Sequence, residues 1–197
     1  MSFRLGLTGS IGMGKSTTAG FFEKAGCAVW DADAAVHRLY AKGGDAVDPI
    51  RSLFPKAVVK DEVSRSALRE ELAKTPSGFE QLEKVVHSLV AKDRAAFTQR
   101  AAADILVFDI PLLFETGGHR SMDAVVCVSI SAAEQKKRVL DRKTMAAEQF
   151  EQILARQMPI TEKLEKADYV VTTDTLEHAK EQVDKIVQDI RENRLNA

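Results

Sequence analysis

The 197-residue chain has little of several features that mark specialised classes of protein. Its two cysteines, Cys27 and Cys127, each lie in a short apolar run, which favours buried core thiols over a disulfide framework or a metal cluster. The formal net charge of −1 provides no overall basic field for nucleic acid. No apolar run is long enough to cross a bilayer, and no signal peptide precedes the first predicted strand. We therefore expect a protein of the reducing cytoplasm that uses neither a membrane nor nucleic acid as a partner.

The most informative segment lies near the N-terminus. Residues 9–16, Gly-Ser-Ile-Gly-Met-Gly-Lys-Ser, fit the phosphate-binding pattern G-x-x-x-x-G-K-[ST], between a predicted strand at 3–7 and a predicted helix at 16–24. Glycines let backbone N–H groups converge on phosphate oxygens, and the helix presents the positive end of its dipole. Lys15 can reach the β- and γ-phosphates, and the Ser16 hydroxyl is a candidate Mg²⁺ ligand. The alternative is a tight glycine turn followed by an exposed lysine. The predicted ATP-binding residues are Gly9, Ile11, Gly12, Met13, Gly14, Lys15, Ser16 and Thr17.

Five short apolar runs, with helical patterns between most of them, predict an α/β fold with a five-stranded parallel sheet flanked by helices. The connection between the second and third runs is too long for one crossover helix. We expect a helical insertion at about residues 43–103 and a charged helical segment, part of it a mobile lid, at about 132–167. The five runs are 3–7, 27–30, 105–110, 124–130 and 169–172. The predicted core comprises about residues 1–42, 104–131 and 168–197.

Acidic residues follow two of the predicted strands. Asp31 and Asp33 come after the second run, and Asp109 ends the third. Ligands of open parallel sheets bind beyond the carboxyl ends of the strands. Asp33 is therefore a candidate general base for an acceptor hydroxyl, and Asp109 a candidate Mg²⁺ ligand with Ser16. The alternative is that Asp31 or Asp33 caps the following helix.

Two further segments could complete such a site. Gln135, Arg138 and Arg142 are spaced so that they share one helix face. Guanidinium groups suit phosphoryl charge and stacking on adenine, whereas a solvated surface is the alternative. Residues 111–115, Pro-Leu-Leu-Phe-Glu, could line a groove for an apolar part of the acceptor, with core packing as the alternative.

The phosphate motif by itself does not separate kinases from GTPases or motor ATPases. The chain has no guanine-binding N-K-x-D motif, and it is short for a large ATPase. A helical insertion and an arginine-bearing lid favour a small-molecule kinase, because such an enzyme closes over both substrates to exclude water.

Several motifs resemble those of dephospho-coenzyme A kinases, in that family's order and over most of the chain. They are Leu7 to Ser16, Asp31-Ala32-Asp33 with His37, residues 111–115, the pattern of Gln135, Arg138 and Arg142, and Lys166 to Val170. The resemblance implies a P-loop kinase core, a helical coenzyme A domain and a lid. It also implies ATP- and Mg²⁺-dependent phosphorylation of the ribose 3′-hydroxyl of dephospho-CoA to give CoA and ADP, the last step of CoA synthesis. We expect a monomer or a weak homo-oligomer.

On this chain, the resemblance implies particular residues for each role. The implied catalytic residues are Lys15, Asp33, Arg138 and Arg142, and Arg142 would also bind ATP by stacking on adenine. The implied substrate-binding residues are Asp33, His37, His87, Leu112, Leu113, Phe114 and Glu115. Taken alone, the two histidines are more typical of structural polar residues.

Two positions depart from the family's pattern. His87-Ser88 stands where the family usually has His-Pro, and Ser88 is a candidate substitute as a helix cap. Thr173-Asp174-Thr175 follows the last strand, where the family usually has Asn and Gly. We therefore expect nucleotide affinity or base selectivity to differ from that usual in the family. Neither change touches the candidate catalytic lysine or acids, and we predict an active kinase.

Overall fold

The computed structural model describes residues 2–143 and 145–195, so Thr144, within the predicted lid segment, lies outside the described residues. The chain divides into two compact units. One comprises Met1–Trp30 with Ala101–Ala197, and the other comprises Asp31–Arg100.

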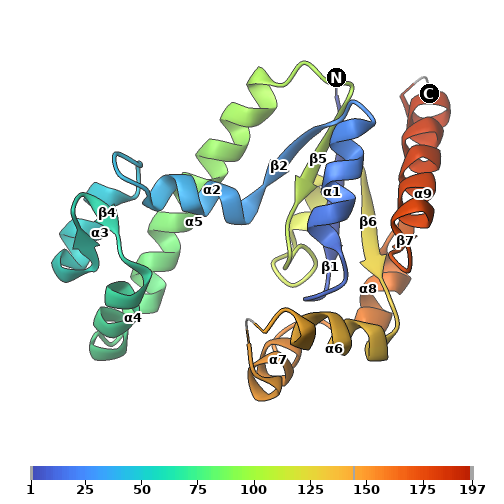
Figure 1. The fold of residues 1–197 in the computed structure, drawn as a ribbon. Helices are drawn as coiled ribbons and strands as arrows, with labels where there is room; N and C mark the ends of the chain where they lie inside the picture. The colour runs from blue at the N-terminus through green and yellow to red at the C-terminus, as the bar shows by residue number, and fades with distance from the viewer. Residues whose placement is uncertain (1, 144, 196–197) are drawn as a thin grey trace. The chain divides into compact units, whose positions relative to one another are not determined.

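The predicted five-stranded sheet is confirmed (Figure 1). Its strand order is β2-β5-β1-β6-β7, and β1 pairs in parallel with β5 and β6, as β6 does with β7. All five residues of β5 are buried, which fits a strand that is covered on both faces and explains its continuous apolar sequence. The strands are β1 (Phe3–Gly9), β2 (Ala28–Asp31), β5 (Ile105–Asp109), β6 (Ala124–Ser129) and β7 (Tyr169–Thr172).

Two helices that are distant in sequence share the main core of the first unit. They are α1 (Lys15–Lys24) and α9 (Leu176–Asp189), which continues into a π-helical turn at Ile190–Arg194. Phe22 of α1 and Val183 of α9 are fully buried in one cluster with Leu5 and Leu7 of β1. The apolar spacing of α9 therefore buries one face against the sheet.

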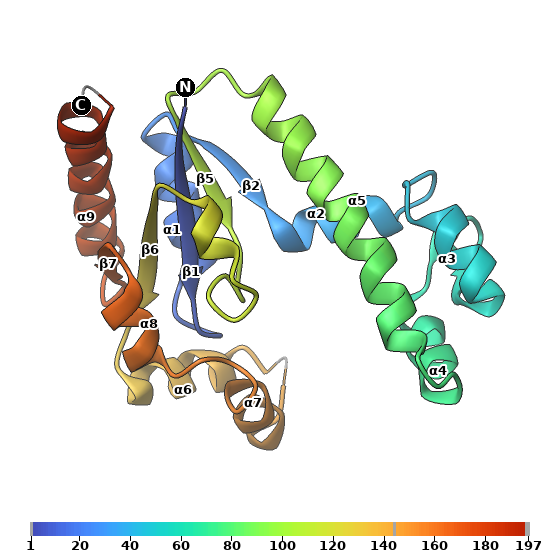
Figure 2. The ribbon, with the colours of Figure 1, turned by 180° about the vertical axis from the view of Figure 1, so that it is seen from behind.

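The segment predicted as the lid is helical throughout most of its length. It forms α6 (Ala132–Asp141), α7 (Ala147–Leu154) and α8 (Ile160–Lys166). Figure 2 shows α6 and α7 beyond the carboxyl ends of β1 and β6, the end of the sheet at which the P-loop begins. A short 3₁₀ helix, Gly118–Ser121, precedes β6.

The second unit has its own core, and it contains a hairpin that the sequence analysis did not predict. Strands β3 (Val58–Val59) and β4 (Glu62–Val63) pair antiparallel around Lys60 and Asp61, whose φ angles of 52° and 64° are left-handed. Two such residues are typical of a tight hairpin turn. The helices are α2 (Ala32–Tyr40), α3 (Val47–Leu53), α4 (Arg65–Lys74) and α5 (Gly78–Arg100), with a 3₁₀ turn at Pro55–Ala57.

One prediction about the second unit is wrong. Helix α5 runs without interruption through His87 and Ser88, so Ser88 lies in the interior of a helix and does not cap one. Its hydroxyl therefore has no terminal N–H groups to satisfy, and the serine is simply tolerated where a proline would remove a backbone donor.

Among the described residues, no helix combines the length and apolar character that a bilayer crossing requires.

Candidate active site

The P-loop connects β1 to α1 through two glycines with left-handed backbone angles. Gly12 has a φ of 78° and Gly14 a φ of 89°, and Gly14 is the N-cap residue of α1. Side chains strain such angles, so the loop conformation requires glycine at both positions. Ser16 and Thr17 are exposed at the first turn of α1, whereas Met13 is buried beneath the loop. The exposed N-terminus of α1 is therefore available to an anion.

Lys15 and Asp109 form an ion pair across 94 positions of the chain. The Lys15 Nζ contacts Oδ1 of Asp109, whose carboxylate is only 1% exposed at the end of β5. The parallel register places Asp109 beside Leu7 of β1, two residues before the P-loop begins. The structure therefore brings the predicted phosphate-binding lysine and the predicted metal ligand into direct contact.

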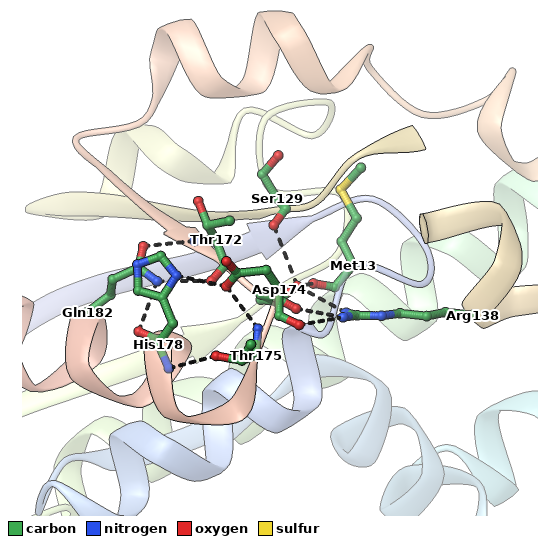
Figure 3. Close-up of polar contacts among 9 residues, drawn as sticks. Met13, Ser129, Arg138, Thr172, Asp174, Thr175, His178 and Gln182 are labelled. Carbon is green, nitrogen blue, oxygen red and sulfur yellow. Dashed lines mark hydrogen bonds and ion pairs between the residues drawn. The ribbon is translucent and has the colours of Figure 1, made fainter. Parts of the chain in front are cut away.

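Arg138 of α6 is attached to the segment that follows β7 (Figure 3). Its guanidinium donates to the Thr173 hydroxyl at 3.2 Å and to the Thr173 carbonyl at 2.7 Å. The Thr173 hydroxyl in turn donates to the Met13 carbonyl of the P-loop at 2.8 Å. Thr173, where the family usually has Asn, thus joins the P-loop to α6. Arg142, at the C-terminal end of α6, is exposed.

Asp174, the other departure in this segment, is engaged with the start of α9 (Figure 3). Its carboxylate accepts the Thr175 N–H at 2.8 Å and lies 2.8 Å from Nδ1 of His178. These two contacts hold the pKa of Asp174 below its ordinary value, and the hydrogen bond from the Thr175 N–H has the larger effect. The new carboxylate therefore has a structural partner on the helix that follows it.

The predicted acceptor segment after β5 divides between core and surface. Leu113 and Phe114 are buried with Val125 in a small core cluster, whereas Leu112 is 41% exposed. Glu115 accepts the Met158 N–H at 2.9 Å and pairs at 2.8 Å with Lys163. The two central residues of the segment therefore pack in the core, which is the alternative that the sequence left open.

Sequence reasoning missed Lys163 altogether. Its side chain has no exposed surface, and its ammonium donates to the Pro111 carbonyl at 3.2 Å in addition to its pair with Glu115. A lysine in a charged helix is ordinarily solvated, so nothing in the local pattern of α8 indicates burial. Only its distant partners distinguish it from its neighbours.

The remaining predicted residues belong to the second unit. Asp31 caps α2 by accepting the Ala34 N–H at 2.9 Å, whereas Asp33 and His37 are exposed on that helix. His37 borders a hollow of about 350 Å³ with Tyr40, and the phenol of Tyr40 has a pKa raised by burial against the opposing effect of Arg65. On α5, an exposed His87 lies 3.6 Å from Glu83. Capping thus falls to Asp31, and the Asp33 carboxylate is presented to solvent.

Four features together define a P-loop kinase. They are the parallel sheet, the glycine-rich loop before α1, the paired lysine and aspartate, and the helical segment after β6. The family model described as dephospho-CoA kinase matches residues 3–178 of this chain. The chain belongs to the dephospho-CoA kinase family and is therefore a phosphotransferase.

Similar proteins agree with this assignment. The dephospho-CoA kinase of Ruegeria pomeroyi is 61% identical over 197 residues and covers all of both chains, and that of Cereibacter sphaeroides is 53% identical over 96% of each. A crystal structure from Thermus thermophilus has 30% identity and a TM-score of 0.84, with 95% of this chain and 96% of that one covered. Shikimate kinase from Bacteroides thetaiotaomicron, at 13% identity and a TM-score of 0.53 over 96% of this chain and 98% of its own, shares the fold alone.

Proposed function

We propose that this chain transfers the γ-phosphoryl group of ATP to the ribose 3′-hydroxyl of dephospho-CoA, which yields CoA and ADP. The observation that carries the proposal is the P-loop with its Lys15–Asp109 pair, in a chain whose full-length relatives are named dephospho-CoA kinases. A cytoplasmic location and a monomeric or weakly self-associating state belong to the same proposal.

The residues around the P-loop suit ATP bound with Mg²⁺. An exposed Ser16 hydroxyl and the Asp109 carboxylate are oxygen ligands of the kind that Mg²⁺ prefers, with phosphate oxygens and water to complete its shell. When bound, Mg²⁺ neutralises charge on the β- and γ-phosphates. Lys15 and Asp109 lie in direct contact in the structure, so the residue that would bind the phosphates is next to the residue that would hold the metal.

On the acceptor side, we assign the general base to Asp33. Its side chain is exposed, and Asp31 rather than Asp33 caps α2. His37, His87, Leu112 and Glu115 contribute to acceptor binding, whereas the buried Leu113 and Phe114 support their segment from the core. Arg138 is held beside the P-loop through Thr173 to stabilise the transferring phosphoryl group. Arg142, exposed at the end of α6, stacks on adenine.

The decisive experiment measures conversion of dephospho-CoA to CoA by the purified chain with ATP, in the presence and absence of Mg²⁺. We expect turnover of about 1–100 per second, and a loss of several orders of magnitude in Lys15→Ala. ATP binding without CoA formation would contradict the proposal. ADP release with another alcohol but not with dephospho-CoA would identify a kinase for a different acceptor.

The same assay tests the base. Asp33→Asn is expected to lower kcat by about 10²–10⁴-fold with ATP affinity near that of the wild type, since general-base catalysis contributes on that scale. Asp31→Asn is the matched control, because asparagine also caps a helix well. Full turnover in Asp33→Asn would rule out the base assignment.

A further inference from the structure

Both polar backbone groups of Ile11, in the middle of the P-loop, are bound by side chains of the lid segment. The Ile11 carbonyl accepts a hydrogen bond from Nε2 of Gln135 at 2.7 Å. The Ile11 N–H donates to Oε1 of Gln157 at 3.2 Å. These partners lie 124 and 146 positions away along the chain, so only the fold brings them to the same residue.

The bond from Gln135 determines how the next peptide group is oriented. In a trans peptide, C=O and N–H point to opposite sides of the chain, and the structure contains no cis peptide among its described residues. With the Ile11 carbonyl directed at α6, the Gly12 N–H is directed away from α6. That orientation leaves the Gly12 N–H available to a phosphate oxygen.

Helix α6 also fits closely against the loop at the same point. A side chain at Gly12 would place its Cβ only 2.4 Å from Cγ2 of Val139 and 3.4 Å from the Gln135 carbonyl. Gln135 is 4% exposed, so its amide is held in one position by its surroundings. The first turns of α6 therefore form a rigid support behind the P-loop.

Gln157 is held from its other side by the pair that involves the buried lysine. The next residue, Met158, donates its N–H to Glu115 at 2.9 Å, and Glu115 is paired with Lys163. The backbone that carries Gln157 is thus attached to the segment after β5, and its side chain is attached to the P-loop. Gln157 therefore links Ile11 to the segment after β5.

We propose that Gln135 and Gln157 are positioning residues for nucleotide binding: together they hold the two polar groups of Ile11 and so keep the P-loop in its phosphate-binding conformation. Neither residue contacts the phosphates. The inference rests on the proposed function only in naming the reaction for which the nucleotide is bound. The loop binds the nucleotide whichever acceptor is used.

The test compares Gln157→Met, which preserves the length of the side chain but removes the acceptor, with Gln152→Met on the exposed surface of α7. We expect Gln157→Met to raise both the Kd for ADP, measured by titration, and the KM for ATP by about three- to tenfold, as the loss of one hydrogen bond predicts. The KM for dephospho-CoA and the kcat are expected to change less than twofold, and Gln152→Met to match the wild type. A residue that only stabilised the fold would lower the melting temperature without this selective effect on nucleotide.

Gln135→Met and the double variant complete the cycle. Because both amides hold the same residue, the loss of nucleotide affinity in the double variant should be smaller than the two single losses combined. Should Gln157→Met not fold, Gln157→Asn, whose amide is one methylene shorter, takes its place. A Kd for ADP within twofold of the wild type in the folded Gln157 variant would overturn the inference. The ADP titration needs no acceptor, so a wild-type chain that bound ADP but made no CoA would count against the proposed function alone.

Discussion

Lys163 can be buried only because Glu115 accompanies it. Its ammonium pairs with the Glu115 carboxylate and donates to the Pro111 carbonyl. A buried ammonium without such partners would be strongly unfavourable. Burial alone would raise the pKa of Glu115, but hydrogen bonds from Lys163 and from the Met158 N–H outweigh it, and the pKa lies below its ordinary value of 4.5. The pair therefore stabilises the fold while Glu115 is ionised.

This depressed pKa predicts how stability depends on pH. The contribution of Glu115 is fully present above its unfolded-state pKa of about 4.5 and is lost as the pH falls through the lower folded-state pKa. Glu115→Gln should lower the free energy of unfolding by about 1–3 kcal/mol at pH 7, and the difference from the wild type should shrink below pH 4.5. Urea unfolding at a series of pH values measures it. Glu151→Gln, which alters an exposed pair with Lys136, is the control. A difference independent of pH would contradict the role of the charge.

At the scale of single elements, two glycines of the same strand–loop–helix unit differ in whether a side chain could replace their hydrogen. Gly12 has a left-handed φ and no room for a Cβ, because Val139 of α6 lies in its place. Gly20 lies inside α1, and a Cβ there would meet nothing within 4 Å. The first glycine is needed by the loop, whereas the second only weakens a helix.

Alanine at each position should therefore have effects of opposite sign. Gly12→Ala is expected to lower the free energy of unfolding by about 1–3 kcal/mol and to weaken ADP binding. Gly20→Ala is expected to raise the free energy of unfolding by about 0.5–1 kcal/mol, with ADP binding unchanged. Thermal unfolding and ADP titration of both variants provide the measurements. Wild-type stability and binding in Gly12→Ala would show that the loop and α6 adjust more readily than their close contact indicates.

The element that follows β7 illustrates how one departure is accommodated. Thr173 offers a single hydroxyl, yet it donates to the Met13 carbonyl and accepts from Arg138. A hydroxyl can make both interactions at once because it has one proton and two lone pairs. The P-loop therefore keeps a partner at this position although the family's usual asparagine is missing.

At the scale of the whole molecule, the two cysteines report on opening of the fold. Cys27 is 7% exposed and Cys127 is fully buried, and burial raises the pKa of each thiol from 9.0 to about 11. At a given pH near 8, each therefore has about a hundredfold less thiolate than an exposed cysteine, and the residue is also buried.

Alkylation by iodoacetamide should consequently follow unfolding. We expect both thiols to react slowly in the native protein and rapidly in urea, and ADP to slow the native reaction further because it stabilises the folded state. Mass spectrometry of the labelled peptides over time measures both rates. Labelling of either cysteine in the native protein at the rate of a free thiol would contradict its burial.

Much of the architecture could be predicted because its determinants are local. Each of the five strands is a short apolar run, and the P-loop is defined by glycines and a lysine at set spacing, so neighbouring residues carry the information. The hairpin around Lys60 and Asp61 escaped prediction because its strands are only two residues long and its turn lacks the usual glycine or asparagine. Ser88 was misinterpreted because a single substitution does not reveal whether the surrounding helix begins there.

The sequence by itself therefore determined the parallel α/β architecture and the phosphate-binding loop, since these follow from backbone preferences and from the spacing of apolar residues and glycines. Its motifs also carried the resemblance to the family. The tertiary structure alone decided which polar side chains serve one another. Thr173 meets Met13, Gln157 meets Ile11 and Lys163 meets Glu115 across long stretches of chain. Such partners are selected by packing, because a polar group that becomes buried must find a hydrogen-bond partner wherever the fold places one.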